Sequence, residues 1–405
     1  MKSSESIWAE RSEMKRCLMI LPRPIFPLVS GYSNKNYHLV QILANRYRLQ
    51  VVVLTESRLT REELQFYAAQ QVACTVWKRT RRRSVFGALC SLLRGHSLQT
   101  GYYFDRRLEK RVRELAEQSE VCIASLIRTW NYLEALPPDP DKTLVFDMVD
   151  SIALNYEGSR RRAASVLWRW IYTVESKRLM REEQHAIEHS SVTYLFNEAE
   201  YRYWLLRGNV RLLPHGVPEQ LFSYTKRDRR FQASVAFIGK MDYQPNVDAI
   251  LWYLREIHTK IGGMLPLLIV GAGPTREVKA LAGKLGNVTV TGFVEDPYLY
   301  LNSALAVIAP MQTGGGIQNK VLEGMALGKV NVVTSLAAKP IVGAADRQHL
   351  LIADSPEAFI HILSDIRDHP NRYHAIGLHA RELIRKRYTW EHYGRLYIEG
   401  IEESQ

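Results

Sequence analysis

The sequence predicts an α/β protein with two doubly wound parallel sheets, one in each half of the chain. Three observations support this prediction. The 405 residues exceed what one hydrophobic core usually organises, so two domains of roughly 150 to 200 residues are expected. Short apolar runs alternate with amphipathic segments through the first half. The same alternation restarts after a break rich in proline and glycine.

Residues 14–215 are predicted to form the first domain. A helix is expected over residues 35–46, between the first two strands. The strands are the continuous apolar runs typical of buried parallel sheets, at residues 18–21, 49–54, 121–124 and 143–146. The segment RLLPHGVP at residues 211–218 interrupts the pattern, and the charged run at residues 226–230 is expected to be a linker.

Residues 216–405 are predicted to form the second domain. Its expected strands lie at residues 234–239, 266–270, 288–291, 305–310 and 330–334. Two such Rossmann-like domains are expected to face a central cleft that binds a ligand. Residues 356–397 are predicted to be helical, and their aromatic, amphipathic end is expected to pack back on the N-terminal domain.

The composition is that of a globular, cytoplasmic protein. Hydrophobic residues make up 46% of the chain and charged residues 24%, which is enough to build a substantial core. The first thirteen residues are polar, and no apolar run approaches the length that spans a bilayer. The cysteines Cys17, Cys74, Cys90 and Cys122 form no CxxC pair, which predicts reduced thiols and no metal site.

The net charge of +12 indicates an acidic partner, either nucleic acid, anionic lipid or a phosphorylated small molecule. Residues 78–94 concentrate this charge, since KRTRRR from Lys78 to Arg83 precedes the apolar SVFGALCSLL and then Arg94. One interpretation is a solvated surface. The other is peripheral docking on an anionic membrane at its inner face. Nucleic acid is not expected as a partner, because the basic residues are not interleaved with stacking aromatics.

The segment TGGGIQNKVLEGMALGK at residues 313–329 carries the most distinctive pattern. Gly314, Gly315 and Gly316 follow an expected strand, so their backbone N–H groups and the next helix N-terminus predict an anion site. On that helix, expected over residues 317–327, Lys320 and Glu323 share one stripe. They form either a surface ion pair or, for Glu323, an acceptor for the two hydroxyls of a ribose.

The same segment resembles the signature of glycosyltransferase family 4, the retaining nucleotide-sugar enzymes with the GT-B fold. Four further segments, in the expected order, resemble that family: LPHGV, FIGKMDYQPNVDA, IVGAGP and TGFVEDPYLYL. The set is most similar to the exopolysaccharide-type sugar transferases. The resemblance implies transfer of a sugar from a nucleoside-diphosphate sugar to a glycan or lipid-linked acceptor. It implies no metal and no separate cofactor.

The resemblance also implies roles for residues of the second domain. Glu323 would hold the donor ribose, and backbone amides near Gly314, Gly315 and Gly316 would meet the diphosphate and the sugar. Lys240 matches the family's basic residue on the diphosphate, with Lys320 assisting. Phe293 and Val294 would line the base; the alternative is that they form a buried turn.

In the first domain, the resemblance implies an acceptor site. Gly31 remains from the family's glycine-rich loop near the donor phosphates. Asp147 and Asp150, at the end of an expected strand, would orient or deprotonate the acceptor hydroxyl. Asp150 has a structural alternative as the N-cap of the next helix. His215 is expected to be a hinge residue rather than a base.

The sequence departs from the family pattern at two positions. Gly315 stands where many members place a second glutamate on the donor sugar, and Pro245 or Asn246 replaces a lysine. A non-catalytic, nucleotide-binding GT-B protein is therefore an alternative. Two weaker alternatives are a basic nucleic-acid-binding protein and a dinucleotide oxidoreductase using GAGP. The oxidoreductase hypothesis lacks the third glycine of its motif.

Overall fold

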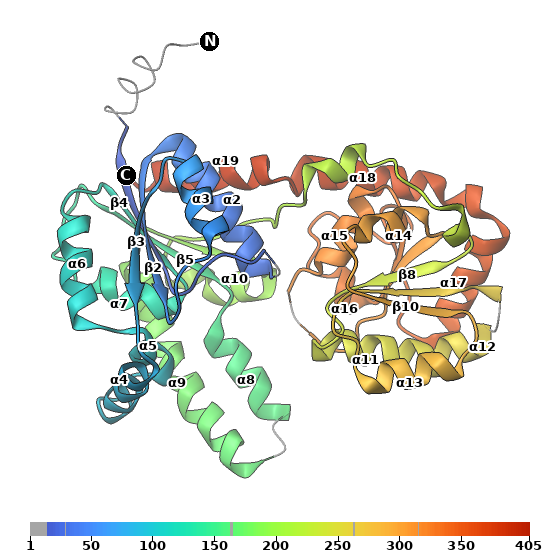
Figure 1. The fold of residues 1–405 in the computed structure, drawn as a ribbon, viewed down its shortest axis with the longest axis horizontal. Coiled ribbons are helices and arrows are strands. Elements are labelled where there is room, and N and C mark those ends of the chain that lie inside the picture. The colour runs from blue at the N-terminus through green and yellow to red at the C-terminus, as the bar shows by residue number, and fades with distance from the viewer. Residues whose placement is uncertain (1–13, 29, 163–164, 262–263, 315) are drawn as a thin grey trace, which may run out of the picture. The chain divides into compact units, whose positions relative to one another are not determined.

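The computed structural model describes residues 14–28, 30–162, 165–261, 264–314 and 316–405 (Figure 1). The chain divides into two compact units. The first runs to Leu213 and takes in Gly394–Gln405, while the second comprises Pro214–Tyr393. The second unit thus starts two residues before the boundary expected at 215/216. The end of the chain lies with the first unit and not with the second, where the range 216–405 had put it.

The first unit is built on a seven-stranded sheet whose paired strands are all parallel. The strand order is β3-β2-β1-β4-β5-β6-β7, which confirms a doubly wound sheet. The strands are β1 Arg16–Leu21, β2 Arg48–Thr55, β3 Ala73–Lys78, β4 Val121–Ser125, β5 Thr143–Val149, β6 Val192–Leu195 and β7 Val210–Leu212. The four predicted strands are β1, β2, β4 and β5. Strand β3 was not predicted because it is half exposed and mixed in character, and β6 and β7 because they are short.

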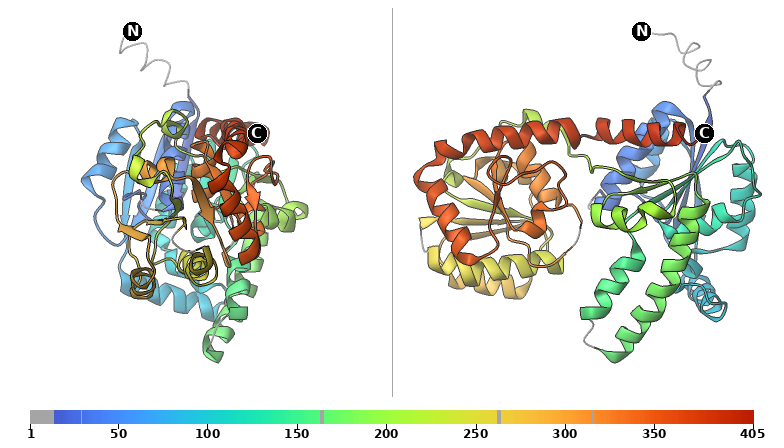
Figure 2. Two further views of the ribbon diagram at one scale, coloured as in Figure 1. Left: turned by 90° about the vertical axis from the view of Figure 1, so that its right-hand side faces the viewer. Right: turned by 180° about the vertical axis from the view of Figure 1, so that it is seen from behind.

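Helices cover both faces of this sheet. They are α2 Gly31–Arg46, α3 Arg61–Ala69, α4 Arg81–Leu93, α5 Leu98–Tyr103, α6 Arg106–Ala116, α7 Ile127–Glu134, α8 Ile152–Arg162, α9 Val166–His189 and α10 Glu198–Trp204, with the 3-10 turn η1 Leu205–Arg207. Helix α2 begins four residues earlier than expected, because the Ser30 hydroxyl caps it by accepting from the Ser33 amide. Helices α8 and α9 form a hairpin that projects from the sheet (Figures 1 and 2).

The second unit is built on a six-stranded parallel sheet. Its strands are β8 Val235–Ile238, β9 Leu267–Val270, β10 Val288–Gly292, β11 Ala306–Ala309, β12 Val330–Val333 and β13 Leu351–Ile352. The order is β10-β9-β8-β11-β12-β13. All five predicted strands are present. The strand order reverses between β8 and β11, and this switch point is where such sheets bind ligands.

Helical segments surround the second sheet. They are η2 Glu219–Ser223, η3 Arg229–Phe231, α11 Gln244–Tyr253, the π-helical η4 Leu254–His258, α12 Thr259–Ile261, α13 Arg276–Lys284, α14 Pro297–Ser303, α15 Asn319–Ala326, α16 Ser335–Ala338, α17 Pro356–Asp368, η6 Pro370–Tyr373 and α18 His374–Arg387, and they are followed by the last helix, α19 Trp390–Glu402, most of which belongs to the first unit. The charged run at residues 226–230 is not a linker. It packs on α14, where the Asp228 amide donates to the Ser303 hydroxyl at 2.7 Å and Lys226 pairs with Asp296 at 3.3 Å.

The last helix, α19, packs on the first unit, as the sequence predicts (Figure 2). The Tyr194 hydroxyl donates to the Tyr397 carbonyl at 2.6 Å, and the two rings stack with centroids 4.2 Å apart. Arg46 and Arg211 add surface ion pairs to Glu402 and Glu403, each at 2.6 Å. Since both tyrosines are fully buried, the aromatic stack contributes far more to this contact than the exposed ion pairs do.

We expect Tyr397→Ala to lower the free energy of unfolding of the first unit by about 3–5 kcal/mol, because it leaves a cavity beside Tyr194. Urea denaturation followed by circular dichroism measures the change. Arg395→Ala, at an exposed position of the same helix, is the matched control and is expected to change stability by about 0.5 kcal/mol or less. Equal effects of the two substitutions would show that α19 is not anchored by its buried face.

Candidate functional site

The candidate site lies in the second unit, at the carboxyl edge of the sheet beside the switch point. Three glycines stand at the ends of β8, β9 and β10, namely Gly239, Gly271 and Gly292. The backbones of the first two approach so closely that a Cβ on Gly271 would lie 1.9 Å from the Gly239 carbonyl oxygen. The Gly271 amide also donates to the Gly292 carbonyl at 3.2 Å. Gly239 and Gly271 leave no room for a side chain, which brings bare backbone to the edge where such sheets bind ligands.

The glycine loop after β11 turns the chain into α15. Gly314 has φ +102° and Gly316 has φ +79°, both in the left-handed region that favours glycine. A Cβ on Gly314 would also lie 3.3 Å from the Pro245 side chain. Gly315, the predicted contact for the donor sugar, lies outside the described residues. Gln318 at the N-cap of α15 makes no side-chain capping bond, so the helix N-terminus suits an external anion.

Glu323 lies one turn into α15 and is partly buried. The Tyr298 hydroxyl, from α14, donates to its Oε1 at 3.5 Å. Burial raises the pKa of Glu323 to about 7, although Lys320 and the bond from Tyr298 oppose the change. The carboxyl is thus held near an anion site with acceptor oxygens suited to a vicinal diol.

Lys320 is buried beneath the glycine loop rather than exposed in a surface ion pair. Its ammonium donates to the side-chain oxygens of Asn246 at 2.7 Å and Gln318 at 3.1 Å. It also lies 5.1 Å from the centroid of the Phe237 ring. Burial lowers the pKa of Lys320 to about 8, and Glu323 opposes that change. A buried ammonium with neutral partners retains much of its positive potential for a phosphate.

Asn246 helps to build the site, although the sequence did not predict a role for it. It is one of the two residues, with Pro245, that the sequence offers in place of the family's lysine, and its side chain is buried. Its Nδ2 donates to the Lys240 carbonyl at 2.9 Å, while its Oδ1 accepts from Lys320. One amide therefore joins the turn after β8 to α15. The ammonium next to this turn is that of Lys320 on α15. The sequence motif alone did not predict this contact.

The Lys240 side chain is exposed and pairs with Asp242 at 3.3 Å. The structure therefore brings the Lys240 backbone to the site, while its ammonium has an acidic partner that a phosphate would have to displace. Asp242 was not among the predicted site residues. Its side chain also lies 3.2 Å from the position of a Cβ on Gly273.

The two residues predicted to line a base differ in environment. Phe293 is 78% exposed, so the alternative of a buried turn is wrong for this residue. Val294 is partly buried and packs against a small cluster of Ala236, Leu268, Val270 and Ala304. An exposed phenylalanine beside the site is free to stack on a ligand ring.

In the first unit, Asp147 and Asp150 lie at the carboxyl end of β5 in different environments. Asp147 is fully buried and forms an ion pair with the buried Lys35 of α2. Burial lowers the pKa of Lys35, and Asp147 opposes the change. Asp150 is solvent-accessible, but desolvation by surrounding protein raises its pKa, with Lys35 opposing. Lys35 gave no sequence signal, since a lysine near the start of a helix is usually solvated.

The capping alternative for Asp150 is not what the structure shows. The Ser151 hydroxyl accepts from the Leu154 amide at 3.2 Å, and Glu183 accepts from the Ala153 amide at 3.0 Å. Val149, between the two aspartates, has φ +66°. A β-branched residue in the left-handed region is strained, and such strain clusters at functional sites.

The other predicted residues have simple environments. Gly31 is exposed at the start of α2, and a Cβ there would meet nothing within 4 Å. His215 lies beside Trp390, with ring centroids 5.0 Å apart. All four cysteines are free. Within the described ranges, no three His, Cys, Asp or Glu side chains are grouped to hold a metal ion. None of the described helices is long and apolar enough to cross a membrane.

Comparison with known proteins supports the class that this architecture defines. The two parallel-sheet units match solved glycosyltransferases of the GT-B fold. Residues 232–368 match the family model described as glycosyl transferases group 1. The matched range lies within the second unit and includes Lys240, the glycine loop and Glu323. A search of curated proteins finds no match.

Three solved structures illustrate the similarity in fold. HepE of Anabaena, in complex with UDP, is 11% identical with a TM-score of 0.67, over 96% of this chain and 100% of that one. A TarM variant of S. aureus, with fondaparinux, alpha-GlcNAc-glycerol and UDP, is 10% identical with a TM-score of 0.66, over 96% and 100%. A glycosyltransferase from Rickettsia africae is 10% identical with a TM-score of 0.65, over 97% and 99%.

The raised pKa of Glu323 predicts a pH-dependent stability. The folded protein keeps a proton on Glu323 between pH 4.5 and about 7, where the unfolded chain has lost it, so this group makes wild-type stability fall as pH rises. We expect Glu323→Gln to remove this dependence. Its stability relative to wild type should increase from pH 5 to pH 8 by on the order of 1 kcal/mol or more.

Urea denaturation at several pH values measures this difference. Glu295→Gln, at an exposed position of the same unit, is the control and should track wild type throughout. A Glu323→Gln curve parallel to wild type across this pH range would mean that the carboxyl is not held in a desolvated site.

Proposed function

We propose that this protein is a glycosyltransferase that moves a sugar from a nucleoside-diphosphate sugar to a glycan or lipid-linked acceptor. The pathway we infer is synthesis of an exopolysaccharide or related glycoconjugate. The observation that carries this proposal is the glycine loop running into α15, with Glu323 one turn in, at the switch point of the second sheet. The group 1 match over residues 232–368 supports it.

In this proposal, Glu323 accepts hydrogen bonds from the ribose hydroxyls. The backbone amides of the glycine loop, including Gly315, and the N-terminus of α15 meet the diphosphate. Lys320 supplies a fixed positive charge beside the glycine loop. The Lys240 ammonium leaves its ion pair with Asp242 and pairs with a donor phosphate instead. Phe293 and Val294 flank the base. Because UDP is bound in the solved HepE and TarM structures, a UDP-sugar is the first donor to test.

The chemistry follows from where charge develops. As the bond between the sugar and the diphosphate breaks, negative charge grows on the departing phosphate. Preorganised amides and the buried Lys320 ammonium stabilise that charge. We infer retention of the anomeric configuration from the family resemblance, with no metal or separate cofactor. The NMR coupling constant of the product's anomeric proton tests this inference.

Ligand binding gives the first test of this site. At 100 times its dissociation constant, a nucleoside diphosphate adds about 2.7 kcal/mol to stability, which raises the melting temperature by several degrees. We expect one of UDP, GDP, ADP and dTDP to do so, and NAD not to. Glu323→Ala should abolish the shift, whereas Glu295→Ala should preserve it. A shift that survives in Glu323→Ala would remove the ribose role.

On the acceptor side, we propose Asp150 as the general base and Asp147 as a positioning residue that holds Lys35. Asp150→Asn should lower kcat by about 10²- to 10⁴-fold while leaving the nucleotide thermal shift unchanged. Release of nucleoside diphosphate from the donor, in the presence of acceptor, measures kcat. Exposed Asp139→Asn is the control. Full activity of Asp150→Asn would exclude it as the base, and no turnover of any donor by wild type would favour the non-catalytic alternative.

We also propose that the protein works on the cytoplasmic side of an anionic membrane, bound through residues 78–94. This segment forms the end of β3 and helix α4. On α4, Phe86, Leu89 and Leu93 are exposed at i, i+3 and i+7, and Leu93 is 88% exposed. Lys78, Arg94 and the three arginines at the start of α4 are exposed as well. Co-sedimentation with anionic vesicles at low salt tests this, and absence of binding would contradict it.

A further inference from the structure

The hairpin of α8 and α9 carries two exposed tryptophans near its projecting end. Trp168 is 53% exposed and Trp170 is 63% exposed, with the exposed Arg169 between them. The inner side of the hairpin is packed, since the Tyr172 ring lies 5.4 Å from Tyr156 and 5.8 Å from Trp168. Two neighbouring indoles that face solvent on a projecting element indicate a contact surface rather than a folding requirement.

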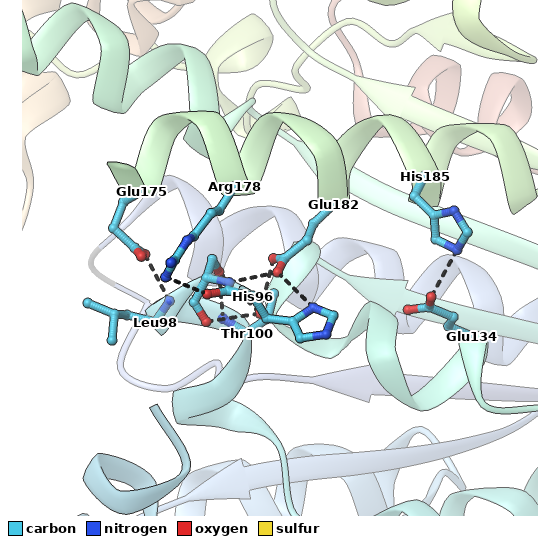
Figure 3. Close-up of polar contacts among 9 residues, drawn as sticks. His96, Leu98, Thr100, Glu134, Glu175, Arg178, Glu182 and His185 are labelled. Carbon is cyan, nitrogen blue, oxygen red and sulfur yellow. Dashed lines mark hydrogen bonds and ion pairs between the residues drawn. The ribbon is translucent and has the colours of Figure 1, made fainter. Parts of the chain in front are cut away.

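Three of the four glutamates of α9 turn inward, which leaves the outer side basic before the last turn of the helix. Glu175 accepts from the Leu98 amide at 2.9 Å, and Glu182 accepts from the Ser97 amide at 2.7 Å and the Thr100 hydroxyl at 3.0 Å (Figure 3). Glu183 accepts from the Ser151 hydroxyl at 2.6 Å. These carboxylates are used as helix caps. The exposed charges along α9 before its last turn are therefore basic: Arg169, Lys177 and Arg181.

A further contact joins α9 to the turn that follows α4. The Arg178 guanidinium donates to the His96 carbonyl at 3.1 Å, in the turn that leaves α4 (Figure 3). In every view, α4 and the end of the hairpin project toward the same end of the first unit, the lower end (Figures 1 and 2). Helices α4 and α9 thus both contact α5, and each carries exposed apolar side chains.

We propose that the end of the α8–α9 hairpin is a second membrane contact, in which Trp168 and Trp170 enter the interface of an anionic bilayer. Indole rings favour the headgroup region, where one edge is apolar and the N–H remains wet. The basic residues of α9 complement anionic headgroups. A bilayer fits better than a rigid protein partner, because α4 and the hairpin are separate convex projections. The inference extends the proposed membrane association and does not depend on the transfer reaction.

The test uses vesicles of phosphatidylcholine and phosphatidylglycerol with brominated acyl chains, which quench tryptophans that enter the interface. We expect quenching of the wild-type protein and its loss in the variant Trp168→Ser/Trp170→Ser. Vesicle affinity should fall by about tenfold or more, since two large apolar side chains are removed. Leu206→Ser, at a 92% exposed position of η1, is the control and should bind and quench as wild type does.

Two further measurements distinguish the hairpin contact from the α4 contact and from the donor site. Phe86→Ser/Leu93→Ser should weaken binding but keep quenching in the fraction that is bound, because the hairpin is intact. The nucleoside-diphosphate thermal shift should be unchanged in the tryptophan variant, which separates this proposal from the donor site. If the double variant misfolds by circular dichroism, Trp170→Ser alone is the milder replacement. The proposal would be overturned if the tryptophan variant were quenched as strongly as wild type, or if wild type bound neutral vesicles equally well. It would also be overturned if the substitutions changed self-association, measured by sedimentation velocity, and left vesicle binding unchanged.

Discussion

The hydrogen bond from the buried ammonium of Lys320 to Asn246 is the contact on which the candidate site depends. A cation in this position must be satisfied by nearby acceptors, because water is largely excluded. Asn246 meets that need with its Oδ1 and uses its Nδ2 to hold the Lys240 carbonyl. The turn after β8 and the helix after β11 are therefore fixed to each other before any ligand arrives. Preorganisation of this kind is what stabilises a charge that appears only during reaction.

The two units use the same physical device at the same edge of their sheets. In the first, Lys35 from the helix after β1 meets Asp147 at the end of β5. In the second, Lys320 lies near Glu323 on the helix after β11. Burial lowers the pKa of both lysines, while the nearby carboxylate opposes that change. Both sheets thus hold desolvated opposite charges at the carboxyl ends of their strands, where the field they create is strongest.

Helix α9 shows how one element can serve stability and surface chemistry together. Glu175, Glu182 and Glu183 accept hydrogen bonds from amides at the starts of α5 and α8, which would otherwise lack partners. Because those carboxylates are consumed inside, the solvent side of the helix keeps its basic charge. Exposed basic side chains and exposed apolar side chains therefore occur together on α4 and on α9.

The sequence by itself determined the two doubly wound sheets and the placement of the glycine loop, because both depend on local patterns. Apolar runs define buried parallel strands, and a glycine run after a strand allows only a few backbone paths. It also indicated Glu323, whose position on α15 follows from helical spacing. Strands β3, β6, β7 and β13 escaped prediction, since short or mixed segments become strands only by pairing with neighbours. Tertiary structure alone decided that Asn246 holds Lys320, that Lys240 pairs with Asp242, and that Lys35 neutralises Asp147. Asn246 and Lys320, like Lys35 and Asp147, lie far apart in the chain. Burial and long-range contacts decide which partner each charged group has, and neither can be read from a local stretch of sequence.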